Sequence, residues 1–255
     1  MHASPQPLIQ FRNASKRYFL QKQRPFLVHE AFRRIFNRRP RGEEFWALKD
    51  VTADIFQGES VAVGGGNGAG KSTMLSLTAG TLAPTVGQVA IRGRISGLLE
   101  LGAGFHSDLS GRENIYLNAS LLGLRKEQIE EQFQSIVDFS ELHKFIDVPI
   151  RNYSSGMHVR LGFAVATHMN PDIMLMDEVL AVGDYNFQQK CIKRILKFRD
   201  DGKTILFVSH SAEAVKKLCK RAIWLEHGSV KMDGPAEEVV EAYGGGAKTD
   251  TAQSS

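Results

Sequence analysis

The chain has 255 residues, of which 42% are hydrophobic and 24% are charged, with a formal net charge of +4. This is ordinary globular composition, with length for one large domain or two small ones. No stretch reaches the ~20 apolar residues that span a bilayer, so we expect any membrane pore to come from another polypeptide. The two cysteines lack metal-ligand spacing, and no secretory signal is present, which favours a reducing cytosol.

The first predicted feature is a strongly basic segment near the N-terminus. Residues 16–41 contain nine basic side chains and a single acidic one, Glu30. Within this segment, a helical spacing of apolar residues is formed by Val28, Ala31, Phe32, Ile35 and Phe36. The pattern fits a helix packed on its own domain and equally a basic amphipathic helix at a membrane surface or against a partner.

Three short apolar runs predict buried central strands in a largely parallel α/β sheet. They cover residues 60–63, 172–176 and 204–208, and helical patterns alternate with them. Each run leads into polar or glycine-rich residues. Because α/β folds bind ligands at the carboxyl ends of their strands, we expect these residues to meet at one edge of the sheet.

A glycine-rich loop follows the first of these strands. The pattern G-x-x-x-x-G-K-[ST] is matched by Gly65, Gly66, Asn67, Gly68, Ala69, Gly70, Lys71 and Ser72. Glycines let consecutive N–H groups turn toward phosphate oxygens, and a helix expected at residues 74–79 adds its dipole. Lys71 can reach the β- and γ-phosphates, and the Ser72 hydroxyl can ligate Mg²⁺. The loop, with Thr73 after it, predicts a nucleotide-binding site.

The middle section, residues 112–169, is expected to be helical throughout, with an amphipathic stretch at residues 127–139. Ser154 can cap a long helix that follows it. A serine hydroxyl, backbone N–H groups and a helix N-terminus together make a second phosphate cradle. Taken alone, the same residues also fit an ordinary helix cap.

Polar residues also end the second and third strands. Asp177 suits a Mg²⁺ ligand beside the glycine-rich loop. Glu178 lies one residue further, where a carboxylate can orient or deprotonate an attacking water, an effect worth roughly 10²–10⁴ in rate. The third strand leads to His210. Each signal is weak alone, but three such strand ends in this order favour a catalytic site.

The residues Tyr-Ser-Ser-Gly-Met at 153–157 resemble the LSGGQ signature of ABC ATPases. Ser154 stands at the serine and Gly156 at the second glycine, whereas Ser155 and Met157 replace the first glycine and the glutamine. In that family, the signature lies on the opposite protomer, so that two chains sandwich two ATP molecules.

The resemblance extends over residues 8–242 and implies the fold. We expect α/β architecture, with a P-loop NTPase (RecA-like) core, a mostly parallel sheet, an antiparallel β region and an inserted α-helical subdomain. The core would comprise about residues 8–97 and 171–242, and the helical subdomain about residues 98–170. Residues 244–255 are small and polar, and we expect a disordered tail there.

Further site residues follow from the family pattern. Tyr18 stands where the family has an aromatic residue that stacks on adenine. Asp184 ends a segment similar to the D-loop, near the dimer seam, and His210 matches the switch histidine that senses the γ-phosphate. The Q-loop glutamine is absent, and Glu100 is the nearest equivalent for its metal contact. Gly66 stands where many relatives have proline or a larger residue, which should loosen the loop.

Residues 98–105 and 110–116 resemble the ATPase subunits of bacterial polysaccharide exporters of the O-antigen, capsule and teichoic-acid type. The resemblance implies ATP and Mg²⁺ as cofactors and a homodimer as the working form. It also implies a separate membrane permease that moves a lipid-linked glycan. The chain would then lie at the cytoplasmic face of the inner membrane, held there through the permease.

Alternative functions are an ABC cassette for another substrate, a nucleic-acid-linked ABC protein and a purely structural nucleotide-binding module. The basic segment motivates the nucleic-acid alternative. Such relatives usually have two cassettes or a long coiled coil, and this sequence has neither. We therefore expect no nucleic-acid partner.

Overall fold

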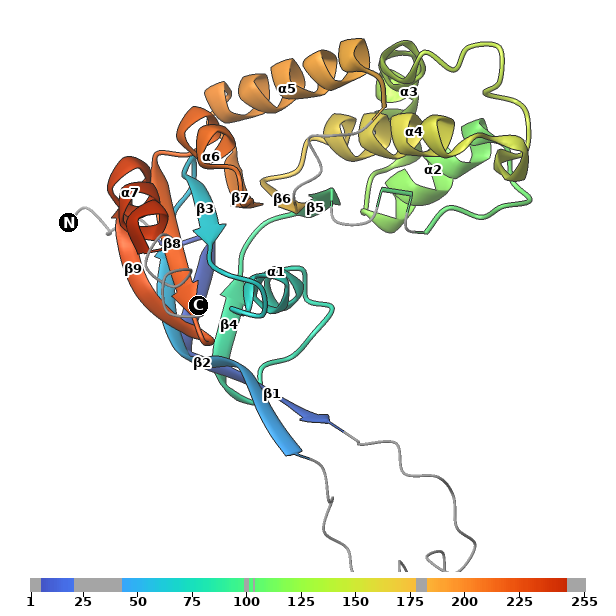
Figure 1. Ribbon diagram of the computed structural model, residues 1–255. Helices are drawn as coiled ribbons and strands as arrows, with labels where there is room; N and C mark the ends of the chain where they lie inside the picture. The colour runs from blue at the N-terminus through green and yellow to red at the C-terminus, as the bar shows by residue number, and fades with distance from the viewer. Residues whose placement is uncertain (1–5, 21–42, 99–100, 103, 178–182, 247–255) are drawn as a thin grey trace, which may run out of the picture.

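The structure, a computed structural model, describes residues 6–20, 43–98, 101–102, 104–177 and 183–246. Two β-sheets pack against each other, and helices surround them (Figure 1). The smaller sheet is antiparallel and has the strand order β2-β1-β4. Its strands are β1 (Ile9–Leu20), β2 (Glu43–Ile55) and β4 (Val86–Ile91).

The larger sheet has six strands in the order β5-β6-β7-β3-β8-β9. Neighbouring strands are parallel from β5 to β8, and only β9 runs antiparallel. The strands are β3 (Ser60–Gly64), β5 (Ile95–Leu98), β6 (Ile173–Asp177), β7 (Thr204–Val208), β8 (Arg221–Glu226) and β9 (Ser229–Pro235). The three strands expected from the sequence are therefore β3, β6 and β7.

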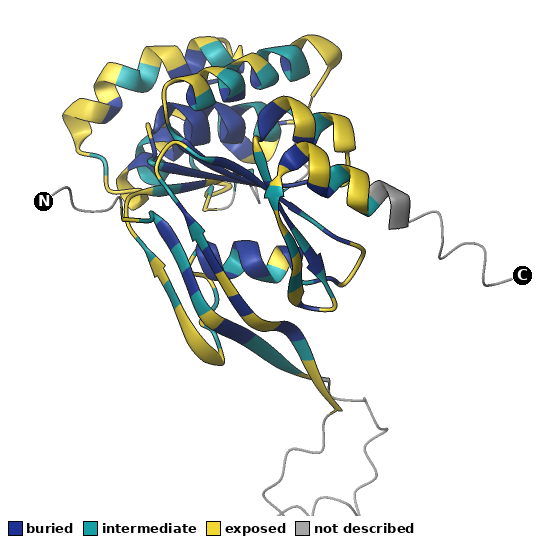
Figure 2. Cartoon of the chain, turned by 90° about the vertical axis from the view of Figure 1, so that its left-hand side faces the viewer, coloured by how far each residue is buried: buried dark blue, intermediate teal, exposed yellow. Residues whose placement is uncertain are grey.

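The central strands are apolar on both faces because helices or the second sheet cover each face. In β3, Val61 and Val63 pack into a core shared with the antiparallel sheet, whereas Ala62 packs into a core on the opposite face. Side chains of a strand alternate between faces, so a strand covered on both faces needs a continuous apolar run. Figure 2 shows these strands buried and the outer surfaces of the helices exposed.

Helices divide between the two faces. Helix α1 (Lys71–Thr78) packs with the antiparallel sheet against one face of the larger sheet. Residues of four helices pack against the other face: α4 (Ser155–His168), α5 (Tyr185–Asp200), α6 (Ala212–Leu218) and α7 (Ala236–Gly246). The chain thus forms three layers, with the six-stranded sheet in the middle.

A helical section projects from one end of the sheet, as the green and yellow segments of Figure 1 show. It contains α2 (Gly111–Leu121), α3 (Lys126–Ser140), the 3₁₀ helix η3 (Ile150–Asn152) and the N-terminal part of α4. These elements share a third apolar core. The expectation of helix throughout residues 112–169 was wrong, because residues 122–125 and 141–149 lie outside the helices. Gly123 and Glu141, near the ends of α2 and α3, have left-handed φ values of 82° and 63°.

The expected α/β architecture with a mostly parallel sheet, an antiparallel region and a helical section is confirmed. Helix α7 continues to Gly246 and so includes the start of the segment expected to be a tail. The rest of that segment and the basic residues 26–39 lie outside the described residues.

Candidate functional site

The motifs predicted at strand ends lie in one row along the carboxyl edge of the larger sheet. Asp177 of β6 pairs with Val208 of β7, and Val208 pairs with Val63 of β3. Because neighbouring strands lie about 4.8 Å apart, Asp177 is about 10 Å from the start of the glycine-rich loop. His210 follows Val208 after one residue and is exposed at this edge. The fold therefore brings Asp177 and His210 to the loop, as the spacing predicted.

Lys71 lies at the centre of the glycine-rich loop. Its Nζ donates hydrogen bonds of 2.8 Å to the carbonyl oxygens of Gly65 and Gly66. The side chain is buried, with 8% of the residue exposed. Helix α1 begins at this lysine, and its N-cap, Gly70, has no side chain to offer the first-turn amides. Those amides and the lysine cation together favour an anionic ligand.

Two glycines of the loop are required by close contacts. A Cβ on Gly65 would lie 2.4 Å from the carbonyl oxygen of Leu225, and Gly65 has a φ of 146°. A Cβ on Gly70 would lie 2.4 Å from the carbonyl oxygen of Ala47, at a φ of 107°. Gly66 differs, because a Cβ there would meet nothing within 4 Å. Gly66 is thus the glycine that the loop geometry tolerates replacing.

The turn between β8 and β9 holds the loop against β2, which the sequence analysis missed. The Gly228 amide donates to the Ala69 carbonyl at 3.1 Å, and the Gly228 carbonyl accepts from the Lys49 amide at 2.8 Å. His227 and Gly228 have φ values of 49° and 85°, as a type I′ hairpin turn requires. A His-Gly pair between two strand-like runs is a recognisable hairpin signal.

A pocket of about 250 Å³ adjoins the loop on the side of β2. Its lining consists of Glu44, Phe45, Trp46, Lys49, Gly68 and His227. Tyr18, expected to stack on adenine, is not one of these residues but pairs with Phe45 across the β1–β2 ladder. The pocket thus combines aromatic faces and a cation next to the phosphate-binding backbone.

Two residues proposed to hold Mg²⁺, Ser72 and Asp177, offer oxygen ligands at the carboxyl edge of the larger sheet. Ser72 is exposed in the first turn of α1, and Asp177 is partly exposed at the end of β6. A hydroxyl and a carboxylate suit Mg²⁺, which takes few protein ligands and completes its shell with phosphate oxygens and water. Glu178 and Glu100 lie outside the described residues, so their roles stay predictions.

Ser154 caps helix α4, as expected. Its Oγ accepts a hydrogen bond of 3.3 Å from the Met157 amide. Ser154 and Ser155 are exposed. Just before them, the buried Tyr153 donates its hydroxyl to the Phe145 carbonyl at 2.7 Å, and burial raises the pKa of Tyr153 to about 12. Tyr153 therefore anchors the start of the helix while its first turn stays accessible.

Gly156 has no steric requirement within the chain. The nearest atom to a Cβ placed there is Ser154 Oγ, at 3.8 Å. Glycine in a helix is less stable than alanine by roughly 0.5–1 kcal/mol. Without a Cβ at Gly156, a group from outside the chain can approach the backbone closely at this position.

The glycine-rich loop and the start of α4 do not meet within one chain. Helix α1 packs on the face of the larger sheet that the antiparallel sheet covers. Helix α4 packs on the opposite face and continues into the helical section (Figure 1). The glycine-rich loop and the start of α4 therefore lie on different sides of the molecule.

Comparison with known proteins identifies the family. The sequence profile of the ABC transporter family matches residues 48–181. An O-antigen export system ATP-binding protein of Klebsiella pneumoniae is 47% identical over 245 residues, which cover 93% of this chain and 98% of that protein. The chain belongs to the ABC transporter family.

Other relatives and solved structures agree with this assignment. A teichoic acids export ATP-binding protein of Listeria innocua is 43% identical, over 92% of this chain and 69% of that protein. An ATP-binding cassette solved as a dimer with ADP and phosphate has the same fold, with a TM-score of 0.70 at 24% identity over 89% of this chain and 98% of that chain. An ABC transporter ATP-binding subunit reaches 0.74 at 21% identity, over 93% of each chain. This ABC subunit binds and hydrolyses ATP.

The ABC subunit also has an apolar groove near the edge where β5 ends. The groove has a volume of about 230 Å³, and its apolar lining includes Leu101, Phe105, Leu121, Leu122 and Val165. Leu121 is 70% exposed. Among the described residues, no helix is both long and apolar enough to cross a bilayer.

Proposed function

We propose that this chain is the ATP-hydrolysing subunit of an exporter that moves a lipid-linked polysaccharide across a bacterial inner membrane. A separate membrane permease forms the path, and the chain lies on the cytoplasmic side. The observation that carries the proposal is the 47% identity to an O-antigen export ATP-binding protein over nearly the whole of both chains. The similarity to a teichoic acids export protein supports the same class of cargo.

The working form is a homodimer. Each chain has one phosphate cradle at Lys71 and another at Ser154, and these belong to opposite sides of its central sheet. A two-fold symmetric pair lets each loop face the helix start of its twin, which yields two equal sites. Two ATP molecules then close the pair, since ATP contacts both chains only in the closed state.

Each residue of the composite site has a chemical task. Lys71 and the loop amides bind the β- and γ-phosphates, and Ser154 and Gly156 of the second copy approach the γ-phosphate from the other side. Ser72 and Asp177 would hold Mg²⁺, which offsets phosphate charge. Glu178 orients the attacking water and His210 contacts the γ-phosphate.

The groove around Leu121 is the docking site for the permease. It offers exposed leucines to a partner, and its lining includes Ser96 and Gly97 of β5, a strand that ends at the same edge of the sheet as β6. Closure of the dimer can therefore move a permease segment seated in this groove.

Polysaccharide export in the host cell tests this function. Deleting the gene in its host should make lipid-linked polysaccharide accumulate inside the cell, and wild-type chain but not Lys71→Ala should restore export. Leu121→Asp should keep nucleotide binding and lose export. Val86→Asp, which changes another exposed apolar residue far from the groove, is its control and should export normally. Normal surface polysaccharide in the deletion strain would contradict the assignment.

A further inference from the structure

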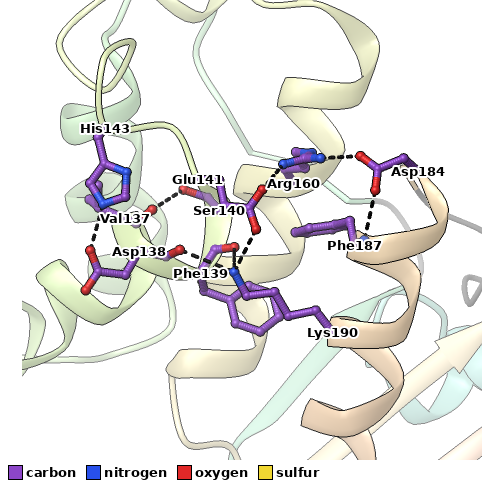
Figure 3. Close-up of polar contacts among 10 residues, drawn as sticks. All are labelled: Val137, Asp138, Phe139, Ser140, Glu141, His143, Arg160, Asp184, Phe187 and Lys190. Atoms are coloured by element: carbon purple, nitrogen blue, oxygen red, sulfur yellow. Dashed lines mark hydrogen bonds and ion pairs between the residues drawn. The ribbon is translucent and has the colours of Figure 1, made fainter.

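Arg160 lies on α4, six residues after Ser154, and joins three elements (Figure 3). One guanidinium nitrogen donates to Glu141 Oε2 at 2.6 Å, and another donates to Asp184 Oδ2. The guanidinium carbon lies 4.8 Å from the centre of the Phe187 ring on α5. The Arg160 side chain is 20% exposed, whereas the carboxylates of Glu141 and Asp184 are 51% and 57% exposed, so solvent partly screens these contacts.

Asp184 has two hydrogen-bond duties. Its Oδ1 accepts from the Phe187 amide at 3.0 Å and caps α5, while its Oδ2 accepts from Arg160. The Phe187 amide, followed by the Arg160 side chain, lowers the pKa of Asp184, so this carboxylate stays ionised. Asp184 thus fixes the start of α5 relative to Arg160 and hence to α4.

Glu141 accepts a hydrogen bond from the other side of the Arg160 guanidinium. Its own backbone has the left-handed conformation that glycine most often adopts. Glu141 ends α3 with a φ of 63°. Its Oε1 accepts from Lys190 Nζ at 3.0 Å, and this contact, followed by that of Arg160, lowers the pKa of Glu141. Glu141 therefore ties the end of α3 both to Arg160 on α4 and to Lys190 on α5.

Arg160 connects two parts of the chain that are expected to act on ATP. Under the proposed function, the N-terminus of α4, with Ser154, contacts the ATP bound to the second copy. Asp184, at the start of α5, ends the segment similar to the D-loop and is expected near the seam of the pair. Arg160 donates to this carboxylate from within α4.

We propose that Arg160 is a positioning residue for ATP hydrolysis, which holds the start of α4, with Ser154, at a fixed place relative to Asp184 at the start of α5. The proposal rests on the proposed function, because it assumes that both parts act on ATP. Arg160 touches no reacting atom and acts through Asp184. Small displacements of catalytic groups can cost up to roughly 10²-fold in rate.

Arg112 supplies a matched control. It donates to Asp147 Oδ1 at 2.6 Å, and its guanidinium carbon lies 4.6 Å from the centre of the Phe133 ring. This arginine has the same kinds of partner, a carboxylate and an aromatic face, but it stays within the helical section and reaches neither α4 nor α5.

The test compares Arg160→Gln, Arg160→Lys and Arg112→Gln in the full 255-residue chain. We expect Arg160→Gln to lower kcat roughly ten- to hundredfold, with ATP affinity of the separate chains and Tm close to those of Arg112→Gln. Arg160→Lys should recover part of the rate because it keeps the charge. The double variant Arg160→Gln with Asp184→Asn should be no slower than the slower single variant, since both remove the same contact.

Two results would overturn the proposal: a kcat for Arg160→Gln equal to that of Arg112→Gln, or rate losses of Arg160→Gln and Asp184→Asn that multiply in the double variant. Failure of the proposed function is recognised separately, because the deletion strain would then show normal surface polysaccharide. A wild type that is active beside an inactive Lys71→Ala leaves the result for Arg160 interpretable on its own.

Discussion

At the scale of single residues, replacing Gly156 should affect stability and activity in opposite directions. An added methyl group meets no atom closer than 3.8 Å, so Gly156→Ala should raise the free energy of unfolding by about 0.5–1 kcal/mol. The same methyl group would stand where the nucleotide approaches, so ATP turnover should fall. Urea unfolding and steady-state ATPase assays measure the two effects. Gly162→Ala is the control and should destabilise, because its Cβ would lie 2.7 Å from the Gly102 nitrogen. Unchanged turnover in Gly156→Ala would remove this glycine from the site.

The glycine-rich loop makes a graded prediction. Gly70→Ala should weaken ATP binding at least roughly tenfold, because the left-handed backbone and the contact with Ala47 strain any side chain there. Gly66→Ala should bind ATP about as well as wild type, since its Cβ has open space. Titration calorimetry with ATP measures both variants. Equal losses in the two would show that loop flexibility matters more than the close contact.

The nucleobase platform has two candidate positions. The family pattern indicates Tyr18, whereas the pocket beside the loop is lined by Trp46 and Phe45. Stacking on a base is worth about 1–3 kcal/mol, or roughly 5- to 150-fold in affinity. We expect Trp46→Ala to raise the KM for ATP by an amount in this range and Tyr18→Ala to raise it less. A larger increase in KM for Tyr18→Ala than for Trp46→Ala would indicate that Tyr18 stacks on the base.

At the scale of elements, the sequence predicted what depends on local pattern. The strands β3, β6 and β7 were recognisable because each is a short apolar run that ends in polar residues. The antiparallel sheet was not placed strand by strand, because β1 and β2 are long, bulged and only half-buried, so their apolar period is irregular. The break in the helical section depends on Glu141, whose left-handed backbone no composition signal shows.

We expect the free energy of unfolding to depend on pH because of His168, near the C-terminal end of helix α4. The imidazole is buried, its Nδ1 lies 2.7 Å from the Ala164 carbonyl, and burial lowers its pKa from 6.5 to about 4. As pH falls below 6.5, the unfolded chain binds a proton that the folded chain refuses. This group should therefore cost about 2 kcal/mol of unfolding free energy between pH 7 and pH 5. His168→Gln should lack that part of the decline in urea unfolding, and an identical decline in both proteins would contradict it.

At the scale of the whole molecule, the decisive contacts join residues far apart in sequence. The hairpin turn at Gly228 holds Ala69, and Asp184 meets Arg160. Sequence patterns gave the candidate residues Lys71, Asp177 and His210, since each follows a strand end. They could not give the pocket lining at Trp46 and His227, because those contacts depend on how β2 and the β8–β9 turn pack beside the loop.

We propose that each ATP site is shared between two copies of the chain, and mixing two inactive variants tests this arrangement directly. Lys71→Ala and Ser154→Ala homodimers should each be inactive, because every site lacks one half. In a mixed pair, the intact loop of one chain faces the intact helix start of the other. Random pairing should therefore restore about a quarter of the wild-type ATPase rate per chain. A mixture that stays as inactive as its two components would contradict the shared site.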